Sequence, residues 1–214
     1  MDRSIPAETV ARIAEYARDT LSAPRFAHVE RVVQLTQRLC RRFALSEASG
    51  LCAAWGHDIA REWPEDQLLT WSQRDGASQR DGALRRDPLN DPLDALERRH
   101  PVLLHGRVAA RLLLEEFDVR DEAVLSAVRH HTLGHPQMGP LARVLFVADY
   151  FEPGRAFLTS QTRTVPERDD LNEMVCAAIE DVIRRGLELA PVTARLYRQV
   201  KPQTPRRDGG MNAS

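Results

Sequence analysis

The sequence predicts an all-α protein that forms one domain. Apolar residues recur at helical spacing from Glu8 to about Val200, and neither the alternation of a half-buried strand nor an internal repeat is present. The length of 214 residues is enough for one well-buried core, and 43% apolar residues is ordinary for a globular protein. We therefore expect a helical domain with irregular ends.

Two helices are expected before residue 44. The first covers residues 8–20 and ends before Pro24, because proline disfavours helical geometry in the residue that precedes it. The second covers residues 25–43 and has an apolar stripe that begins one turn after His28. This stripe consists of Val32, Leu35 and Leu39. His28 is therefore expected to point toward the core.

The third helix is expected to begin at Ser46, a good N-cap residue, and to end before Pro64. It carries His57 and Asp58 near its end. The following segment, residues 72–92, is rich in Gly, Asp, Arg, Ser and Pro, a composition typical of a surface loop. We predict a mobile insertion there that contributes nothing to the core.

Four more helices are expected after this insertion. They cover residues 101–117, 121–131, 140–149 and 167–189. The polar C-terminal tail has little to bury and is expected to be disordered. The predicted organisation is an N-terminal helix packed on the domain in residues 1–24, the domain itself in residues 25–200, and the tail in residues 201–214.

The composition argues against several classes of function. With 30 basic and 31 acidic residues, the chain has no overall attraction for nucleic acid or an anionic membrane. No segment approaches the roughly 18 to 20 apolar residues of a membrane span, and the N-terminus lacks the apolar part of a signal peptide. Three widely spaced cysteines indicate neither a disulfide framework nor a zinc knuckle. We expect a cytoplasmic protein without nucleic-acid or membrane partners, and the sequence allows a homodimer without requiring one.

Six polar residues on the expected helices require an explanation. They are His28, His57, Asp58, His105, His131 and Asp149. A single inward histidine is usually a hydrogen-bonded core residue, but a buried carboxylate is costly without a cation or strong donors. The adjacent His57 and Asp58 can converge on one centre only near a helix end. Facing helices of bundles form metal sites in this way, and a mixed imidazole and carboxylate set suits iron, manganese or zinc.

The order of these residues resembles the HD superfamily of metal-dependent phosphohydrolases, whose pattern is a histidine, a His-Asp pair, further histidines and a final aspartate. The closer resemblance is to the YqeK-type subgroup, the symmetrical diadenosine tetraphosphate hydrolases, or bis(5'-nucleosyl)-tetraphosphatases. The segments that carry it are RFAH at 25–28, GHDIAR at 56–61, PVLLHG at 101–106, HTLG at 131–134 and ADYFEPGR at 148–155.

The resemblance implies an HD-domain helical bundle with two metal ions in its core. The residues implied around the first ion are His28, His57, Asp58 and Asp149. Those implied around the second are His105 and His131, with Asp58 bridging the two ions. Members of the subgroup resemble di-iron enzymes, so two divalent or mixed-valence iron ions are expected, with manganese or another transition metal as the alternative. The implied catalytic residues are Asp58 and Arg61, and the implied substrate-binding residues are Arg61 and Arg155.

The chain departs from the subgroup pattern at two positions near these residues. Arg61 stands where the family usually has a lysine, which would exchange a flexible point charge for a planar guanidinium. His130 stands where an aromatic residue is common, so it could be an alternative ligand or support one. The insertion at residues 72–92 is also longer than expected.

The expected reaction is hydrolysis of a phosphoanhydride. Water activated by the two metals would attack phosphorus and divide diadenosine tetraphosphate into two ADP molecules. Two other functions stay open, namely an HD-type nucleotidase or phosphodiesterase with another nucleotide substrate, and a nucleotide-binding module without catalysis. A substrate panel separates the two enzymes, and Asp58→Ala separates enzyme from module. Simple pairing of the polar groups in the core is the remaining interpretation.

Overall fold

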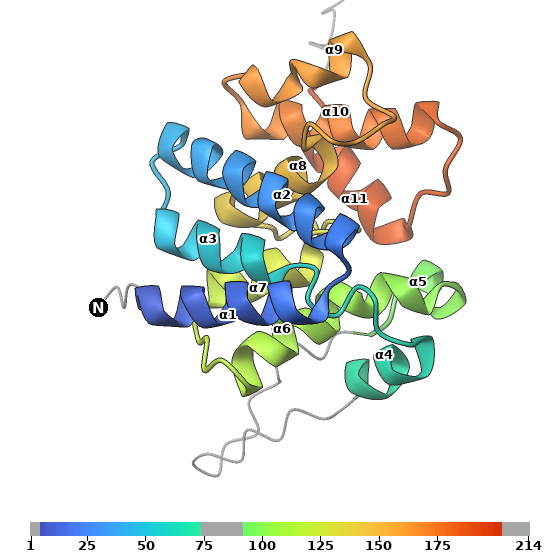
Figure 1. Cartoon of the computed structure of the whole chain (residues 1–214). Helices are drawn as coiled ribbons and strands as arrows, with labels where there is room; N and C mark the ends of the chain where they lie inside the picture. The colour runs from blue at the N-terminus through green and yellow to red at the C-terminus, as the bar shows by residue number, and fades with distance from the viewer. Residues whose placement is uncertain (1–4, 74–91, 203–214) are drawn as a thin grey trace, which may run out of the picture.

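The computed structural model describes residues 5–73 and 92–202, and all the regular structure in these ranges is helical (Figure 1). The longer helices are α1 (Ala7–Thr20), α2 (Ala23–Arg42), α3 (Glu47–Gly56), α4 (Glu65–Ser72), α6 (His105–Glu115), α7 (Glu122–His130), α8 (Pro140–Phe151), α10 (Leu171–Arg184) and α11 (Pro191–Val200). The short elements are α5 (Ala95–Arg99), α9 (Ser160–Arg163) and the 3-10 turns η1 (Pro101–Leu104) and η2 (Val165–Glu167). The predicted all-α fold is confirmed.

Five helices form the part of the bundle that surrounds the candidate site. α2 packs against α3 and α8, and α7 packs against α3, α6 and α8. α1 covers α3 from the outside, whereas α10 packs on α8 and carries α11 beside it (Figure 1). Residues far apart in the sequence therefore reach one centre from several directions.

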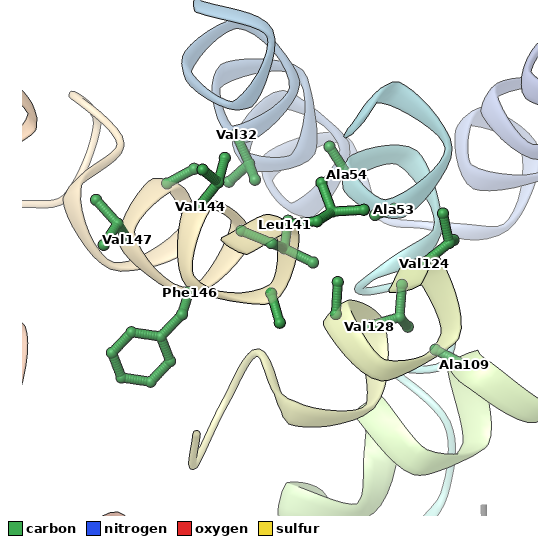
Figure 2. Packing of buried hydrophobic residues seen from close by; sticks show 14 of the residues in the cluster. Val32, Ala53, Ala54, Ala109, Val124, Val128, Leu141, Val144, Phe146 and Val147 are labelled. Carbon is green, nitrogen blue, oxygen red and sulfur yellow. The ribbon is translucent and has the colours of Figure 1, made fainter. Parts of the chain in front are cut away.

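One large apolar cluster holds these helices together (Figure 2). Val144 of α8 lies toward Val32 of α2, and the small residues Ala53 and Ala54 of α3 allow close packing beside them. Val128 of α7 joins the same cluster and is fully buried. The stripe predicted for the second helix is buried, as is His28, which is 5% exposed. The predicted inward orientation of His28 is thus confirmed.

Two predicted helix boundaries in the N-terminal half are wrong. α2 begins at Ala23, with Pro24 in its first turn, where the missing N–H of proline is no disadvantage. α3 has its predicted N-cap, since Ser46 Oγ accepts a hydrogen bond from the Ser49 amide, but it ends at Gly56 rather than before Pro64. The His-Asp pair consequently lies in the turn that follows the helix.

The C-terminal helix prediction is also wrong in its limits. The expected helix at residues 167–189 is shorter, because Asp170 caps its start and Gly186 adopts a left-handed conformation with φ of 68° after its end. The sequence predicted no specific helix at the positions of α4, α5 and α11. α4 includes Ser72, which is buried and so does not belong to a loop outside the core.

Most of the predicted insertion, residues 74–91, lies outside the described residues, as do the first four residues and residues 203–214 of the predicted tail. None of the helices in the described ranges is long and apolar enough to cross a membrane. All three cysteines of the chain are buried free thiols.

Candidate metal centre

Six side chains converge inside the bundle from five places in the chain. Their positions are His28 on α2, His57 and Asp58 directly after α3, His105 at the start of α6, His131 directly after α7, and Asp149 on α8. All except the partly exposed Asp149 are buried. The structure therefore brings together every residue that the sequence predicted for the cluster.

Three of the histidines are oriented by main-chain carbonyls three residues earlier. Nδ1 of His57, His105 and His131 lies 2.7, 2.6 and 2.7 Å from the carbonyl oxygens of Ala54, Val102 and Val128, respectively. Because a carbonyl oxygen can only accept a hydrogen bond, Nδ1 must carry the proton in each ring. In the neutral imidazole, Nε2 then has a free lone pair. Each of these lone pairs faces the centre of the cluster.

Asp58 lies between two groups of histidines and turns one carboxylate oxygen to each. Its Oδ2 atom is 3.7 Å from Nε2 of His28 and 3.6 Å from Nε2 of His57. Its Oδ1 atom is 3.2 Å from Nε2 of His105 and 3.7 Å from Nε2 of His131. We call His28, His57 and Asp149 the first half of the cluster, and His105 and His131 the second half. Asp58 is shared by both.

The second half places two imidazole nitrogens in direct opposition. Nε2 of His105 and Nε2 of His131 are 3.0 Å apart, although the carbonyl contacts leave both as lone pairs in the neutral rings. The hydroxyl group of Thr132 lies 3.2 and 3.1 Å from these two atoms, but it has only one proton to donate. A shared cation, or a proton on one ring, is needed to relieve this contact.

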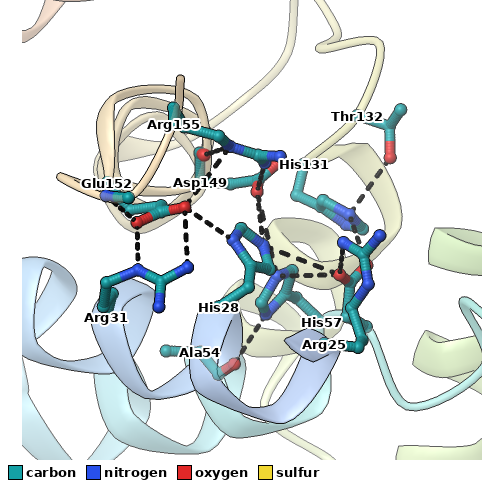
Figure 3. Close-up of polar contacts among 12 residues, drawn as sticks. Arg25, His28, Arg31, Ala54, His57, His131, Thr132, Asp149, Glu152 and Arg155 are labelled. Atoms are coloured by element: carbon teal, nitrogen blue, oxygen red, sulfur yellow. Dashed lines mark hydrogen bonds and ion pairs between the residues drawn. The ribbon is translucent and has the colours of Figure 1, made fainter. Parts of the chain in front are cut away.

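The first half depends on side chains rather than on the main chain for the orientation of His28 (Figure 3). Nδ1 of His28 lies 3.1 Å from Oε1 of Glu152, and its Nε2 lies 3.1 Å from Oδ1 of Asp149. Nε2 of His57 is 4.0 Å from the same oxygen of Asp149. Neither Nε2 atom makes a hydrogen bond of good geometry with any described residue, although both are buried. Buried polar atoms normally have a partner, so these two fit a ligand role.

Glu152 is a buried carboxylate that connects His28 to a guanidinium group. It accepts hydrogen bonds from Nε of Arg31 at 2.5 Å and from the amide of Gly154 at 2.6 Å. Burial acts to raise the pKa of Glu152, but the bonds from His28, Arg31 and Gly154 lower it to about 2. The carboxylate is therefore ionised and can hold the Nδ1 proton of His28 in place.

The charges within the cluster favour a cation. Burial acts to raise the pKa of Asp58 and of Asp149, but the surrounding histidines and, for Asp149, Arg155 hold both well below their ordinary values. Burial lowers the pKa of His57 to about 4. Two ionised carboxylates thus share their site with at least one neutral imidazole, and this donor set fits a transition-metal ion.

Two arginines border the cluster on its solvent-accessible side. Arg25 donates to Oδ2 of Asp58 at 3.0 Å, and Arg155 donates to Oδ1 of Asp149 at 2.5 Å. Both side chains line a cavity of about 370 Å³ together with His28 and Glu152. This cavity, which we call the arginine cavity, gives an anionic ligand access to the first half of the cluster.

Gly106 allows the second half to close. A side-chain Cβ at this position would come within 3.0 Å of the carbonyl oxygen of Val128, 3.1 Å of that of Arg129 and 3.2 Å of Cε1 of His131. Because two of these neighbours are main-chain atoms, they cannot rotate away. Glycine therefore lets the start of α6 approach the end of α7, and this approach sets the contact between His105 and His131.

Arg61 and His130 lie differently from the six convergent residues. Arg61 is half-buried in the turn after Asp58, and within the described part of the chain its guanidinium has no hydrogen-bond or ion-pair partner. His130 stacks on His135 with ring centroids 4.7 Å apart, and burial lowers its pKa to about 3. The role of Arg61 stays a prediction. The stacking of His130 on His135 argues against its suggested role as a ligand.

Sequence reasoning missed four residues around the cluster: Arg25, Arg31, Thr132 and Glu152. Three of them lie in segments that carry the family resemblance, at positions adjoining or close to a predicted ligand. The signal for Glu152 was its place three residues after Asp149, at the end of an apolar helix, where a carboxylate needs a cation. Arg31 gave no such signal, because it is one of many arginines.

Comparison with known proteins agrees with this geometry. The model of the HD domain family matches residues 25–154, a range that contains all six convergent residues. The chain belongs to the HD domain family. The predicted resemblance to HD phosphohydrolases and the predicted HD-type helical fold are thereby confirmed.

Relatives of this HD domain include two proteins named "Bis(5'-nucleosyl)-tetraphosphatase, symmetrical". The one from Bacillus subtilis is 31% identical over 76% of this chain and 80% of its own length. The one from Halalkalibacterium halodurans is 27% identical over 84% of this chain and 90% of its own length. A crystal structure from Clostridium acetobutylicum, described as a predicted HD superfamily hydrolase involved in NAD metabolism, matches with a TM-score of 0.74 and 26% identity, and the match covers 89% of this chain and 95% of that one.

Proposed function

We propose that this protein is a metal-dependent phosphohydrolase that divides diadenosine tetraphosphate symmetrically into two ADP molecules. The observation that carries this proposal is the position of Asp58, whose two carboxylate oxygens face separate groups of buried imidazole Nε2 atoms. The names of the two bacterial relatives support the substrate and the position of cleavage. The predicted enzyme class, a hydrolase acting on a phosphoanhydride, follows from the same relatives.

The proposed ligand sets follow the two halves of the cluster. The first ion would be held by His28, His57, Asp58 and Asp149, and the second by Asp58, His105 and His131. Within the described residues, ligand atoms lie within 4.8 Å of one another in two sets, which are His28, His57 and Asp58, and Asp58, His105 and His131. Four imidazoles and two carboxylates suit iron, which we propose as the metal, with manganese or another transition metal as the alternative.

When bound, metal ions of this kind lower the pKa of a coordinated water and polarise phosphoryl oxygens. The protein's own contribution is to position the substrate and to balance charge. Asp58 and the carbonyl-held histidines fix the donor atoms before substrate arrives, so little reorganisation is needed. Hydrolysis adds water across the central P–O–P linkage, so that one phosphorus gains an oxygen and the bridging oxygen leaves with the other ADP.

Arginines are proposed to hold the phosphate chain in the arginine cavity. Arg25 and Arg155 contact Asp58 and Asp149, so their guanidinium groups lie beside the carboxylates at which the reacting phosphates would arrive. Planar guanidinium groups bind phosphate oxygens in pairs and offset the charge that develops during transfer. Arg61 is proposed as a third phosphate ligand, reaching the same substrate from the turn after Asp58. In kinetic assays, Arg61→Ala should raise KM, and Arg61→Lys should restore most of the affinity.

We propose the cytoplasm as the compartment and residues 25–200 as the catalytic domain, with α1 packed on it. The three buried free thiols suit a reducing compartment. The family match begins at residue 25, and α1 contacts α3 without supplying a residue to the cluster.

The proposed function is tested with freshly purified protein whose metal content is measured first. The metal-replete protein is incubated with diadenosine tetraphosphate, and the nucleotides are separated by ion-exchange chromatography. ADP as the single nucleotide product supports the proposal. AMP together with ATP, or no product at full metal occupancy, contradicts it.

A further inference from the structure

A second cavity borders the cluster and is not explained by metal binding. It has a volume of about 400 Å³, within the range of about 300 to 1,000 Å³ that small-molecule sites occupy. Its walls include Thr132, Leu133, His130 and His135, and none of these residues lines the arginine cavity. We call it the histidine cavity.

Thr132 connects the histidine cavity to the second half of the cluster. Its hydroxyl contacts Nε2 of both His105 and His131, while the residue also lines the cavity. Glu152, which lines the arginine cavity, supports the first half, and Figure 3 shows Thr132 and Glu152 on opposite sides of the histidines. The arginine cavity therefore lies beside the first half of the cluster, and the histidine cavity lies beside the second half.

The walls of the histidine cavity combine the features that bind a nucleoside. The rings of His130 and His135 are nearly parallel, at 21°, and provide a flat aromatic surface. Leu103, Leu133 and Val192 form an apolar side. Purine bases stack on aromatic rings and on apolar surfaces. A neutral imidazole ring can serve as such a stacking surface.

Among the described residues that line this cavity, Arg195 places a cation at the exposed rim. Glu97 is held by Arg107 at 2.6 and 2.8 Å, and Asp94 caps α5, so both carboxylates are compensated. Arg195 of α11 is exposed, and in the ranges that the structure describes its side chain has no ion pair or hydrogen bond. This guanidinium could bind a phosphate attached to a nucleoside in the cavity.

We propose that the histidine cavity binds one adenosine of diadenosine tetraphosphate, while the phosphate chain crosses the cluster toward Arg25 and Arg155. This inference rests on the proposed function, because it assigns a place to one half of the proposed substrate. A substrate with a nucleoside at each end needs a binding surface on both sides of the bond that breaks. The two cavities, each beside a different half of the cluster, supply such surfaces.

The test compares His135→Ala and Arg195→Ala with the control Arg198→Ala, which removes another exposed arginine of α11 that does not line the cavity. The measurements are KM and kcat for diadenosine tetraphosphate, and the Kd of adenosine alone by titration calorimetry. We expect His135→Ala to raise KM and the adenosine Kd about tenfold, the effect of losing one base stack, with kcat and metal content unchanged. Arg195→Ala should raise KM by a similar factor but leave adenosine binding almost intact.

Unchanged KM and unchanged adenosine affinity in folded His135→Ala protein would overturn the inference. Thermal melting checks that each variant folds, and the surface variant Arg195→Ala carries the kinetic test if His135→Ala does not. A metal-replete wild-type protein that cannot cleave the dinucleotide would instead contradict the proposed function. In that case, loss of adenosine binding in His135→Ala still supports the assignment of the cavity, and its persistence still refutes it.

Discussion

His105 and His131 are held by main-chain carbonyls, whereas His28 is held by the side chain of Glu152. The second half of the cluster is therefore fixed by the folding of η1 and α7, which supply the carbonyls of Val102 and Val128. In the first half the carbonyl of Ala54 also holds His57, but His28 depends on a chain of side-chain contacts from Arg31 through Glu152, beside the arginine cavity. Carbonyl support gives rigid donors, and side-chain support leaves the donors that lie next to substrate open to adjustment. The difference between the halves can be measured by substitution.

The largest effect is expected from Asp58→Ala, because Asp58 serves both halves. The variant should lose both ions, and activity should fall by more than the 10- to 100-fold typical of losing an outer-shell partner. Metal content is measured by inductively coupled plasma mass spectrometry, together with ADP formation. Asp58→Asn keeps the side-chain shape and tests whether charge is required. Retention of two ions in either variant would show that Asp58 does not bridge the halves.

Gly106→Ala should disturb the second half most. The added methyl group meets the carbonyl oxygens of Val128 and Arg129, which belong to the main chain and must shift. We expect a loss of about 1–3 kcal/mol in the free energy of unfolding, as for other overpacked sites, and loss of one bound ion. Chemical denaturation and metal analysis measure the two effects. Full occupancy by two ions would mean that the contact between α6 and α7 does not position His105 and His131.

Glu152→Gln should weaken metal binding at the first half alone. A glutamine side chain keeps an oxygen that can accept from His28 Nδ1, but it removes the negative charge that holds the imidazole and Arg31. We expect metal affinity at this half to fall about 10- to 100-fold, measured by competition with a chelator, while the second ion stays bound. Glu167→Gln, which alters an exposed partner of Arg38, is the matched control. Equal losses from both halves would remove the distinction between them.

Gly154→Ala should have a smaller effect on the same half. A Cβ at this position would meet the guanidinium of Arg31, which lies at the end of a flexible side chain and can rotate away. The bond between Arg31 and Glu152 would weaken, yet the contact of Glu152 with His28 would remain. We expect metal affinity at the first half to fall by less than about tenfold, which is the lower limit for losing an outer-shell partner. The same chelator assay measures it. An effect as large as that of Glu152→Gln would show that Arg31 itself fixes His28.

The dependence of stability on pH tests the packing of α3. This helix leads into His57 and Asp58 and so serves both halves. Burial raises the pKa of Cys52 to about 12, so the folded thiol stays protonated while the unfolded thiol ionises near pH 9. Its contribution to stability is therefore complete below pH 9 and is lost as the pH rises from about 9 to 12. The slope should reach at most about 1.4 kcal/mol per pH unit. Cys52→Ala should flatten the curve without changing metal content, and an unchanged slope would contradict the burial of this thiol.

The six convergent residues could be predicted because helical phase is a local property and because their order along the chain resembles the pattern of the HD family. His28 could be placed inward from the apolar stripe that follows it, and the His-Asp pair needed a helix end, which the structure supplies at Gly56. The position of that end could not be predicted, because it depends on which group donates a hydrogen bond to the carbonyl of Ala54, which the helix leaves free. That partner is the His57 ring itself.

The supporting residues were harder to predict because their roles depend on tertiary contacts. Arg31 reaches Glu152 across 121 positions of sequence, and nothing in its neighbourhood distinguishes it from other surface arginines. The short helix α4 was missed because the sequence around Pro64 signalled only the end of a helix. Helix limits and charge partners are set by packing that a single sequence does not reveal.

The central claim is that Asp58 joins two metal sites, and anomalous X-ray diffraction from crystals of the metal-replete protein tests it most directly. The account predicts two anomalous peaks, one between Asp58, His28 and His57 and the other between Asp58, His105 and His131. Crystals of fully loaded protein that show no peak beside Asp58, or peaks only at other residues, would contradict it.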